Sequence, residues 1–180
     1  MATEHLLLDD LLPHARAIAD DIVWATMTTV GTDGRPRGRV VHPVWQWTEE
    51  AAGPIGYLTT RPTPVKQRHL AAHPVASFAY WSPKHDALFV DVDVAWLDRA
   101  GARRVWDLVA SLPPPVGFDP APIFPDGPDG PGYAALALTV RRVQVVLAAR
   151  MAAGEPSLLW TDLATGGAPA AGQGGAVAAR

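Results

Sequence analysis

The chain has 180 residues, of which 48% are hydrophobic and 18% charged, and its net charge is −3; these values predict one folded domain and exclude a disordered chain. The slight acidity argues against a dedicated nucleic-acid-binding protein, and the absence of cysteine excludes disulfides, thiol nucleophiles and cysteine-ligated metals. With no apolar run long enough to span a bilayer and no secretory signal, we expect no membrane association and a cytoplasmic location.

The first elements along the chain are predicted to be a helix and a β-hairpin. Apolar residues at helical spacing predict a helix over residues 4–22, interrupted near Pro13. A run rich in β-branched residues over 22–30 predicts a strand, and the turn sequence Gly-Thr-Asp-Gly-Arg-Pro separates it from a second strand over 37–47.

The second strand carries an arginine at an unusual position. Period-two alternation places Arg39 on the same side as Val41 and Trp45, which is not the pattern of a simple solvent-facing side. A guanidinium can bind two oxygens at once, so this position favours phosphate recognition. The alternative is a charge that protects an edge strand from aggregation.

A second cluster of polar residues lies where a strand over 55–60 leads into a helix over 65–72. The start of a helix carries unpaired N–H groups and partial positive charge, so it stabilises an anion such as a phosphate. A solvated turn that leads into an amphipathic helix explains the same residues about equally well. The hydroxyls are Thr59, Thr60 and Thr63, and the cations are Arg61, Lys66 and Arg68.

The following segments predict more strands and one further helix. The helix is expected over 99–112, with Asp98 as its N-cap. The last long strand is expected to bend near Arg141 and Arg142. The predicted strands are 75–81, 87–97 and 133–149, with a short closing segment around 158–163 that includes Trp160.

The segment 113–132 is rich in Pro, Gly and Asp but also contains large apolar residues. Such a long loop inside a compact domain tends to be functional or to cross an interface. Beyond Thr165 the chain is almost entirely Gly and Ala, which predicts a disordered tail.

These elements predict a mainly β (α+β) fold, namely a six- to seven-stranded antiparallel split β-barrel with peripheral helices. We expect a single domain over residues 1–163, followed by a disordered Gly/Ala tail over 164–180.

The order of these segments resembles the pyridoxamine 5'-phosphate oxidase-like proteins, which are split β-barrels that bind FMN or a deazaflavin coenzyme. The resemblance covers about residues 22–146. It includes Arg-Val-Val in the second strand, His-Pro-Val after the helix, and the family pattern Thr-x-x-x-Ser-x-Lys-x-x-x-Leu. That pattern is matched by Thr60, Lys66 and Leu70, with Pro64 in place of the serine.

The resemblance implies a role for each matched residue. Arg39 and Lys66 would bind the flavin phosphate, with Arg61 as a nearby cation and Thr63 as a possible source of the missing serine hydroxyl. Val40 and Val41 would contact the isoalloxazine ring through their backbone, and Thr59 and Thr60 would hydrogen-bond near the ring or the ribityl chain. Family members are usually homodimers, so the 113–132 loop or Trp160 could complete the site of a partner chain.

The implied function is an FMN-dependent oxidoreductase that acts on a small organic substrate. The alternatives are a reductase that uses the deazaflavin coenzyme F-420, and a flavin-binding protein without turnover. The C-terminal pattern of true pyridoxamine phosphate oxidases is absent, so their activity is not expected.

Other chemistries have weaker support in the sequence. His69 and His73 are four residues apart, but Pro74 follows at once and no third metal ligand is placed, so no metal site is expected. His42 is expected to be a packed or rim histidine that could face the substrate. The Gly-x-Ser-x-Gly motif of serine hydrolases does not occur.

Overall fold

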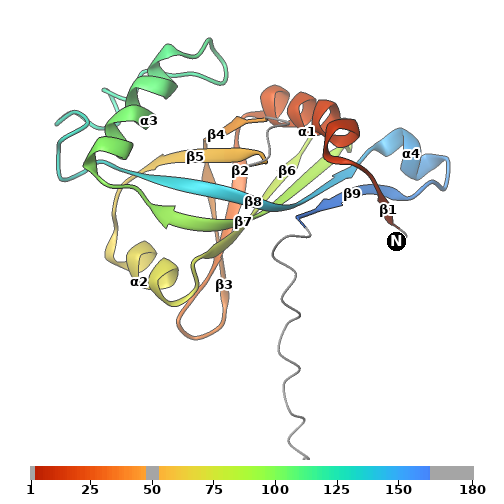
Figure 1. Ribbon diagram of the computed structural model, residues 1–180, viewed down its shortest axis with the longest axis horizontal. Helices are drawn as coiled ribbons and strands as arrows, with labels where there is room; N and C mark the ends of the chain where they lie inside the picture. Colours follow the sequence, from red (N-terminus) through yellow and green to blue (C-terminus); the bar gives the residue numbers. More distant parts are fainter. Residues whose placement is uncertain (1–2, 48–52, 163–180) are drawn as a thin grey trace, which may run out of the picture.

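The computed structural model describes residues 3–47 and 53–162, which form nine strands and four helices (Figure 1). The strands are β1 (Thr3–His5), β2 (Ala25–Val30), β3 (Pro36–Val41), β4 (Pro43–Gln46), β5 (Ile55–Thr60), β6 (Val75–Trp81), β7 (Ala87–Trp96), β8 (Ala134–Val146) and β9 (Ser157–Thr161). The helices are α1 (Leu8–Ile22), α2 (Pro64–Ala72), α3 (Arg99–Ser111) and α4 (Ala148–Ala152). The predicted tail over 164–180 lies outside the described residues.

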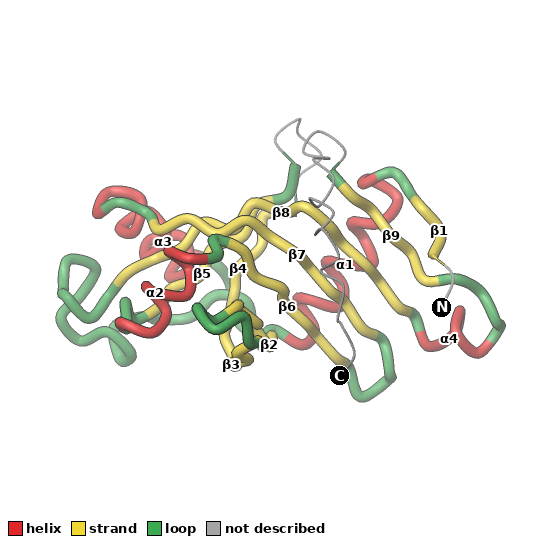
Figure 2. The backbone as a smooth tube through the Cα atoms, turned by 90° about the horizontal axis from the view of Figure 1, so that it is seen from below, coloured by secondary structure: helices red, strands yellow, loops and turns green. Residues whose placement is uncertain are grey.

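The strands form a split antiparallel barrel, which confirms the predicted fold class. Hydrogen bonding runs in the order β3–β2–β6–β7–β8, and β8 also pairs with β5, which pairs with β4. Because only His42 separates β3 from β4, the two ends of this path meet at one corner. The second half of β8 pairs with β9, and β9 pairs in parallel with β1, so the sheet extends beyond the barrel (Figure 2).

The main core lies between this sheet and α1. One face of α1 is buried, and it packs against β6, β7, β8 and β9. The predicted interruption at Pro13 is wrong: α1 runs through this exposed proline, because burial of the opposite face offsets one missing backbone hydrogen bond. The buried face consists of Leu11, Leu12, Ala15, Ile18 and Ala19.

The strand count exceeds the prediction for two reasons. The predicted strand 37–47 is divided at His42, since β3 pairs with β2 whereas β4 pairs with β5. Residues 4 and 5, predicted to begin a helix, instead belong to β1, which pairs with β9. This pairing joins segments more than 150 residues apart, so local periodicity could not indicate it. The short helix α4 was not predicted either.

The predicted bend in the last long strand is confirmed as a β-bulge. In the β7–β8 pair, Asp91 lies opposite Arg142 while Val92 lies opposite Val140, so Arg141 is the extra residue. Its guanidinium donates to Asp93 at 2.7 Å and to Asp162 at 2.6 Å.

A smaller core forms where α3 and the 113–132 loop cover β5 and β8 at one end of the molecule (Figure 1). Phe124 and Tyr133 pack edge to face with ring centres 5.0 Å apart, and Trp106 of α3 packs against both rings. The Tyr133 hydroxyl donates to the Ala102 carbonyl at 2.8 Å. The loop is therefore anchored to the barrel.

Asp98 caps α3 as predicted, because its carboxylate accepts a hydrogen bond from the Gly101 N–H at 2.7 Å. We expect Asp98→Ala to lower the free energy of unfolding by about 1 kcal/mol, since the α3 N-terminus loses its acceptor. Chemical denaturation measures the change. Asp98→Asn, which keeps a side-chain oxygen, should retain most of the stability, and equal losses in both variants would contradict the capping role.

Candidate functional site

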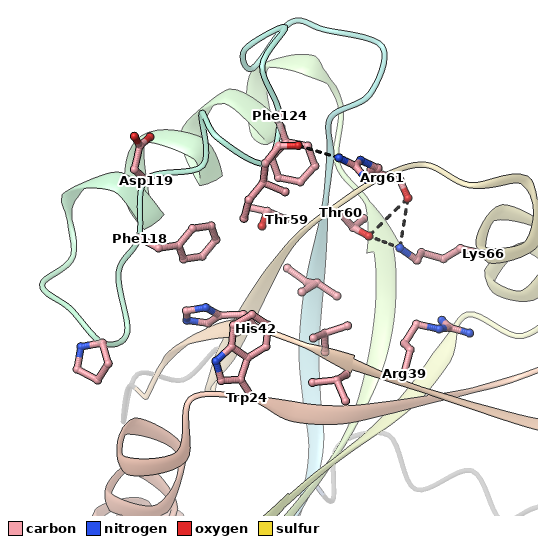
Figure 3. Close-up of a pocket in the computed structure, with 15 residues that line it drawn as sticks. Trp24, Arg39, His42, Thr59, Thr60, Arg61, Lys66, Phe118, Asp119 and Phe124 are labelled. Atoms are coloured by element: carbon pink, nitrogen blue, oxygen red, sulfur yellow. Dashed lines mark hydrogen bonds between the residues drawn. The ribbon is translucent and has the colours of Figure 1, made fainter.

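A pocket of about 590 Å³ opens between β3, β5, the start of α2 and the 113–132 loop (Figure 3). Its two ends differ in chemistry. Arg39 and Lys66 lie at one end, and Trp24, His42 and Phe118 lie toward the other. The lining residues are Trp24, Arg39, Val40, Val41, His42, Leu58, Thr59, Thr60, Arg61, Lys66, Pro115, Phe118, Asp119, Ile123 and Phe124.

Lys66 is a buried cation that extends from the first turn of α2 to the end of β5. Its side chain is only 9% exposed, and its Nζ donates to Thr60 Oγ1 and, at 3.2 Å, to the Arg61 carbonyl. Burial, assisted by the nearby charge of Arg39, lowers the pKa of Lys66 to about 8. The protein thus holds this ammonium where its charge is poorly compensated.

Arg39 on β3 is the second cation at this end of the pocket. Its Nη2 donates to Thr29 Oγ1 at 2.9 Å, while its buried Nη1 has no hydrogen-bond partner. Burial lowers the pKa of Arg39 as well. A buried donor without a partner is costly, and in native proteins it often marks a site for a ligand or an ion.

No ion pair between residues of the described ranges involves Arg39 or Lys66. Two neighbouring cations without an acidic partner repel each other, and that repulsion contributes to the lowered pKa of Lys66. An anion between them would neutralise the charge and accept the free Arg39 N–H. The donor set at this end therefore fits a phosphate group.

The middle of the pocket follows the free edge of β3. This strand pairs only with β2 among the described strands, so alternate backbone N–H and C=O groups on its other edge lack a strand partner. Val40 is 70% exposed here, and Thr59 lines the facing side from β5. An apolar surface bordered by free backbone groups suits a flat ring with polar edges.

His42 forms the far end together with two aromatic rings. Its ring centre lies 5.2 Å from that of Trp24 and 4.7 Å from that of Phe118. Its Nε2 is 2.8 Å from the Val116 carbonyl, and because a carbonyl can only accept, this nitrogen carries the proton. Burial lowers the pKa of His42, so the imidazole is neutral near pH 7.

The structure brings together all but one of the predicted cofactor-binding residues. Thr63 is the exception: it is exposed, it precedes α2 as N-cap without a side-chain hydrogen bond, and it does not line the pocket. The predicted residues that do line the pocket are Arg39, Val40, Val41, Thr59, Thr60, Arg61 and Lys66. Their contacts with a cofactor stay a prediction.

The sequence identified the aromatic end of the pocket only in part: His42 was expected to be a packed or rim histidine that could face the substrate, whereas Trp24 was not singled out. The large apolar residues of the 113–132 loop indicated a functional segment that could complete the site of a partner chain. In the structure they line the pocket of their own chain. Arg61 fixes the loop there, since its Nη2 donates to the Ile123 carbonyl at 2.9 Å. Trp160, the other candidate for completing a site, packs against the main core.

Neither a cluster of metal ligands nor a membrane-spanning helix is found in the described part of the chain. No group of three or more His, Asp or Glu residues there could hold a metal ion, and His69 is hydrogen-bonded to Thr29. Within residues 3–47 and 53–162, every helix is too short or too polar to span a bilayer.

No protein-family model matches the chain, and no curated protein matches its sequence. Several solved structures share its fold. A Clostridium acetobutylicum protein related to general stress protein 26, of the pyridoxinephosphate oxidase family, is 15% identical with a TM-score of 0.65, over 85% of this chain and 95% of that one.

Two further structures carry descriptions that mention a ligand. A pyridoxamine 5'-phosphate oxidase-related, FMN-binding protein from Nostoc punctiforme is 16% identical with a TM-score of 0.52, over 83% of this chain and 84% of that one. An F-420 reductase is 16% identical with a TM-score of 0.50, over 71% of this chain and 94% of that one. At these identities the likeness is one of fold, and it confirms the fold that the sequence resemblance implied.

Proposed function

We propose that this chain, which has the split-barrel fold of the pyridoxamine 5'-phosphate oxidase-related proteins, binds FMN in the pocket and acts as a flavin-dependent oxidoreductase on a small organic substrate. The observation that carries the proposal is the pair Arg39 and Lys66. Both are cations without a carboxylate partner among the described residues, and Arg39 has a buried N–H without an acceptor.

The FMN phosphate belongs at this cationic end. A phosphate carries nearly two negative charges, which the guanidinium of Arg39 and the ammonium of Lys66 would neutralise. The Thr60 hydroxyl, already within reach of Lys66 Nζ, would add a neutral hydrogen bond. The N-terminus of α2 carries partial positive charge, which favours an anion. It lies in the same region, since Lys66 is in the first turn of α2.

The isoalloxazine ring belongs along β3, toward Trp24 and Phe118. The free edge of β3 offers backbone donors and acceptors to the polar rim of the ring, and the aromatic side chains exclude water from its faces. Bound flavin supplies the transfer of electrons or hydride, and the protein positions it. His42 does not act as an acid here, because its one proton is committed to the Val116 carbonyl.

A deazaflavin-dependent reductase is the second candidate. Coenzyme F-420 also presents a phosphate and a tricyclic ring, and one structure of this fold is described as an F-420 reductase. Binding without turnover is the non-enzymatic alternative. The exposed side chains of Val40 and Trp24 at the pocket rim favour a homodimer in which a second copy covers the bound ring.

Titration of the purified protein with FMN, riboflavin and F-420 tests the proposal. We expect FMN to bind at least about 10²-fold more tightly than riboflavin, because only FMN pairs with the two cations. Tighter binding of F-420 would support the second candidate, and equal affinity for FMN and riboflavin would contradict the phosphate assignment. Oxidation of NAD(P)H by the flavin-loaded protein separates an enzyme from a binding protein.

A further inference from the structure

Two buried polar side chains lie behind the cationic end of the pocket without lining it. Thr29 on β2 is fully buried and His69 on α2 is 8% exposed. Thr29 Oγ1 accepts the hydrogen bond from Arg39 Nη2 and lies 3.3 Å from His69 Nδ1. Neither residue belongs to a sequence motif of the site, and neither is needed to contact a ligand.

The chemistry of the groups fixes one direction in this hydrogen-bond chain. A guanidinium can only donate, so Thr29 Oγ1 uses a lone pair to accept from Arg39. Its second lone pair and its hydroxyl proton remain, so the hydrogen bond between Thr29 and His69 Nδ1 can run in either direction, according to the imidazole tautomer. In both cases Thr29 links the Arg39 guanidinium to His69.

This chain connects three elements of the fold. In the β2–β3 register Arg39 lies opposite Met27, so Thr29 is the next residue of β2 on the same face. His69 follows Lys66 by one helical turn, so one face of α2 carries both the second cation and the hydrogen-bond partner of Thr29. The docking of α2 and the orientation of Arg39 are thus coupled through Thr29.

We infer that Thr29 and His69 are positioning residues that hold the Arg39 guanidinium by Nη2, so that Nη1 is kept free for the phosphate. The inference rests on the proposed function. A free arginine side chain samples many rotamers, and holding it in the bound geometry before the ligand arrives lowers the entropic cost of binding. Supporting residues of this kind orient the groups that touch the ligand.

The ratio of the riboflavin Kd to the FMN Kd is the readout, because it isolates the contribution of the phosphate. Thr29→Val removes the acceptor at almost unchanged shape, and we expect the ratio to fall by about 10-fold. Thr29→Ser keeps the hydroxyl and should keep the ratio. Thr28→Val, one position earlier and on the opposite face of β2, is the matched control and should leave the ratio unchanged.

Two further variants keep the test decisive. His69→Leu removes the hydrogen-bond partner of Thr29 and should lower the ratio as Thr29→Val does, which covers the case that one variant fails to fold. In an Arg39→Ala background, Thr29→Val should have no further effect on the ratio, because the group it positions is gone.

Equal weakening of riboflavin and FMN binding by Thr29→Val and His69→Leu would show a merely structural role and overturn the inference. An unchanged ratio in both variants would overturn it as well. If Arg39→Ala itself leaves the ratio unchanged, the phosphate assignment of the proposed function fails too. The Arg39 variant therefore tells the two failures apart.

Discussion

Replacing both Arg39 and Lys66 with alanine is expected to weaken FMN binding by about 10²- to 10⁴-fold while the fold stays intact. Each charge-assisted contact to the phosphate contributes about 1.5–3 kcal/mol, so the loss of both is large. Riboflavin binding should change little, since riboflavin has no phosphate. Isothermal titration calorimetry with both ligands measures the effect.

Two controls separate this effect from general damage. Arg37→Ala removes a cation from the same strand, but Arg37 is exposed and already paired with Asp33 at 3.1 Å, so FMN affinity should be unchanged. Phe118→Ala truncates the aromatic end and should weaken FMN and riboflavin alike. Unchanged FMN affinity in the Arg39/Lys66 double variant would refute the assigned roles.

The ligand-free protein is expected to become more stable between pH 8 and pH 10. The pKa of Lys66 is lowered in the folded protein from 10.5 to about 8. Above pH 8 the unfolded chain therefore binds the Lys66 proton more tightly than the folded protein does, so the free energy of unfolding rises with pH. The full shift corresponds to at most about 3 kcal/mol, because solvent at the open pocket screens part of the interaction. Urea denaturation at several pH values measures the slope.

Lys66→Met is the matched control, because it keeps a long apolar side chain without the charge. The variant should lack the rise between pH 8 and pH 10 and should be at least as stable as the parent at pH 7. Burial raises the pKa of Tyr133 to about 12, and it also raises the pKa of Tyr80 above its usual value. Deprotonation of these phenols above pH 10 therefore reduces the stability of both proteins. If the free energy of unfolding of the parent and of Lys66→Met changed with pH in the same way, the charge of Lys66 would not be the cause of the rise.

Saturating FMN should reduce the pH-dependent rise of the parent protein. A phosphate beside Lys66 stabilises the ammonium and raises its pKa again toward the unfolded value. The charges that destabilise the empty pocket are those that would hold the ligand. Such a cost in stability is common at binding sites, where donors are arranged for a group that the protein itself does not contain.

Local sequence patterns predicted most elements of the fold. The range of β6 was predicted to the residue, α2 to within one residue at its start, and the Asp98 cap and the bulge at Arg141 were placed correctly. These features depend on side-chain periodicity, turn residues and capping within a few positions of the chain. The cationic residues of the site were found in the same way, because β3 and the start of α2 carry them in short segments.

The remaining features depend on contacts between distant segments. The division of the second strand at His42 follows from pairing with two different strands, and β1 exists only because β9 lies beside it. The aromatic end of the pocket forms when the 113–132 loop reaches His42, whose ring bonds to the Val116 carbonyl 74 positions away. No local pattern contains that information.

The sequence by itself predicted a split barrel and singled out the cations Arg39 and Lys66, since strand alternation and a helix start are local properties of the chain. Only the tertiary structure decided that both cations lie at one end of one pocket, that Thr63 lies outside it, and that Thr29 forms hydrogen bonds with both Arg39 and His69. The reason is physical: whether a buried charge has a partner depends on every segment folded around it, and that is settled only when the barrel closes.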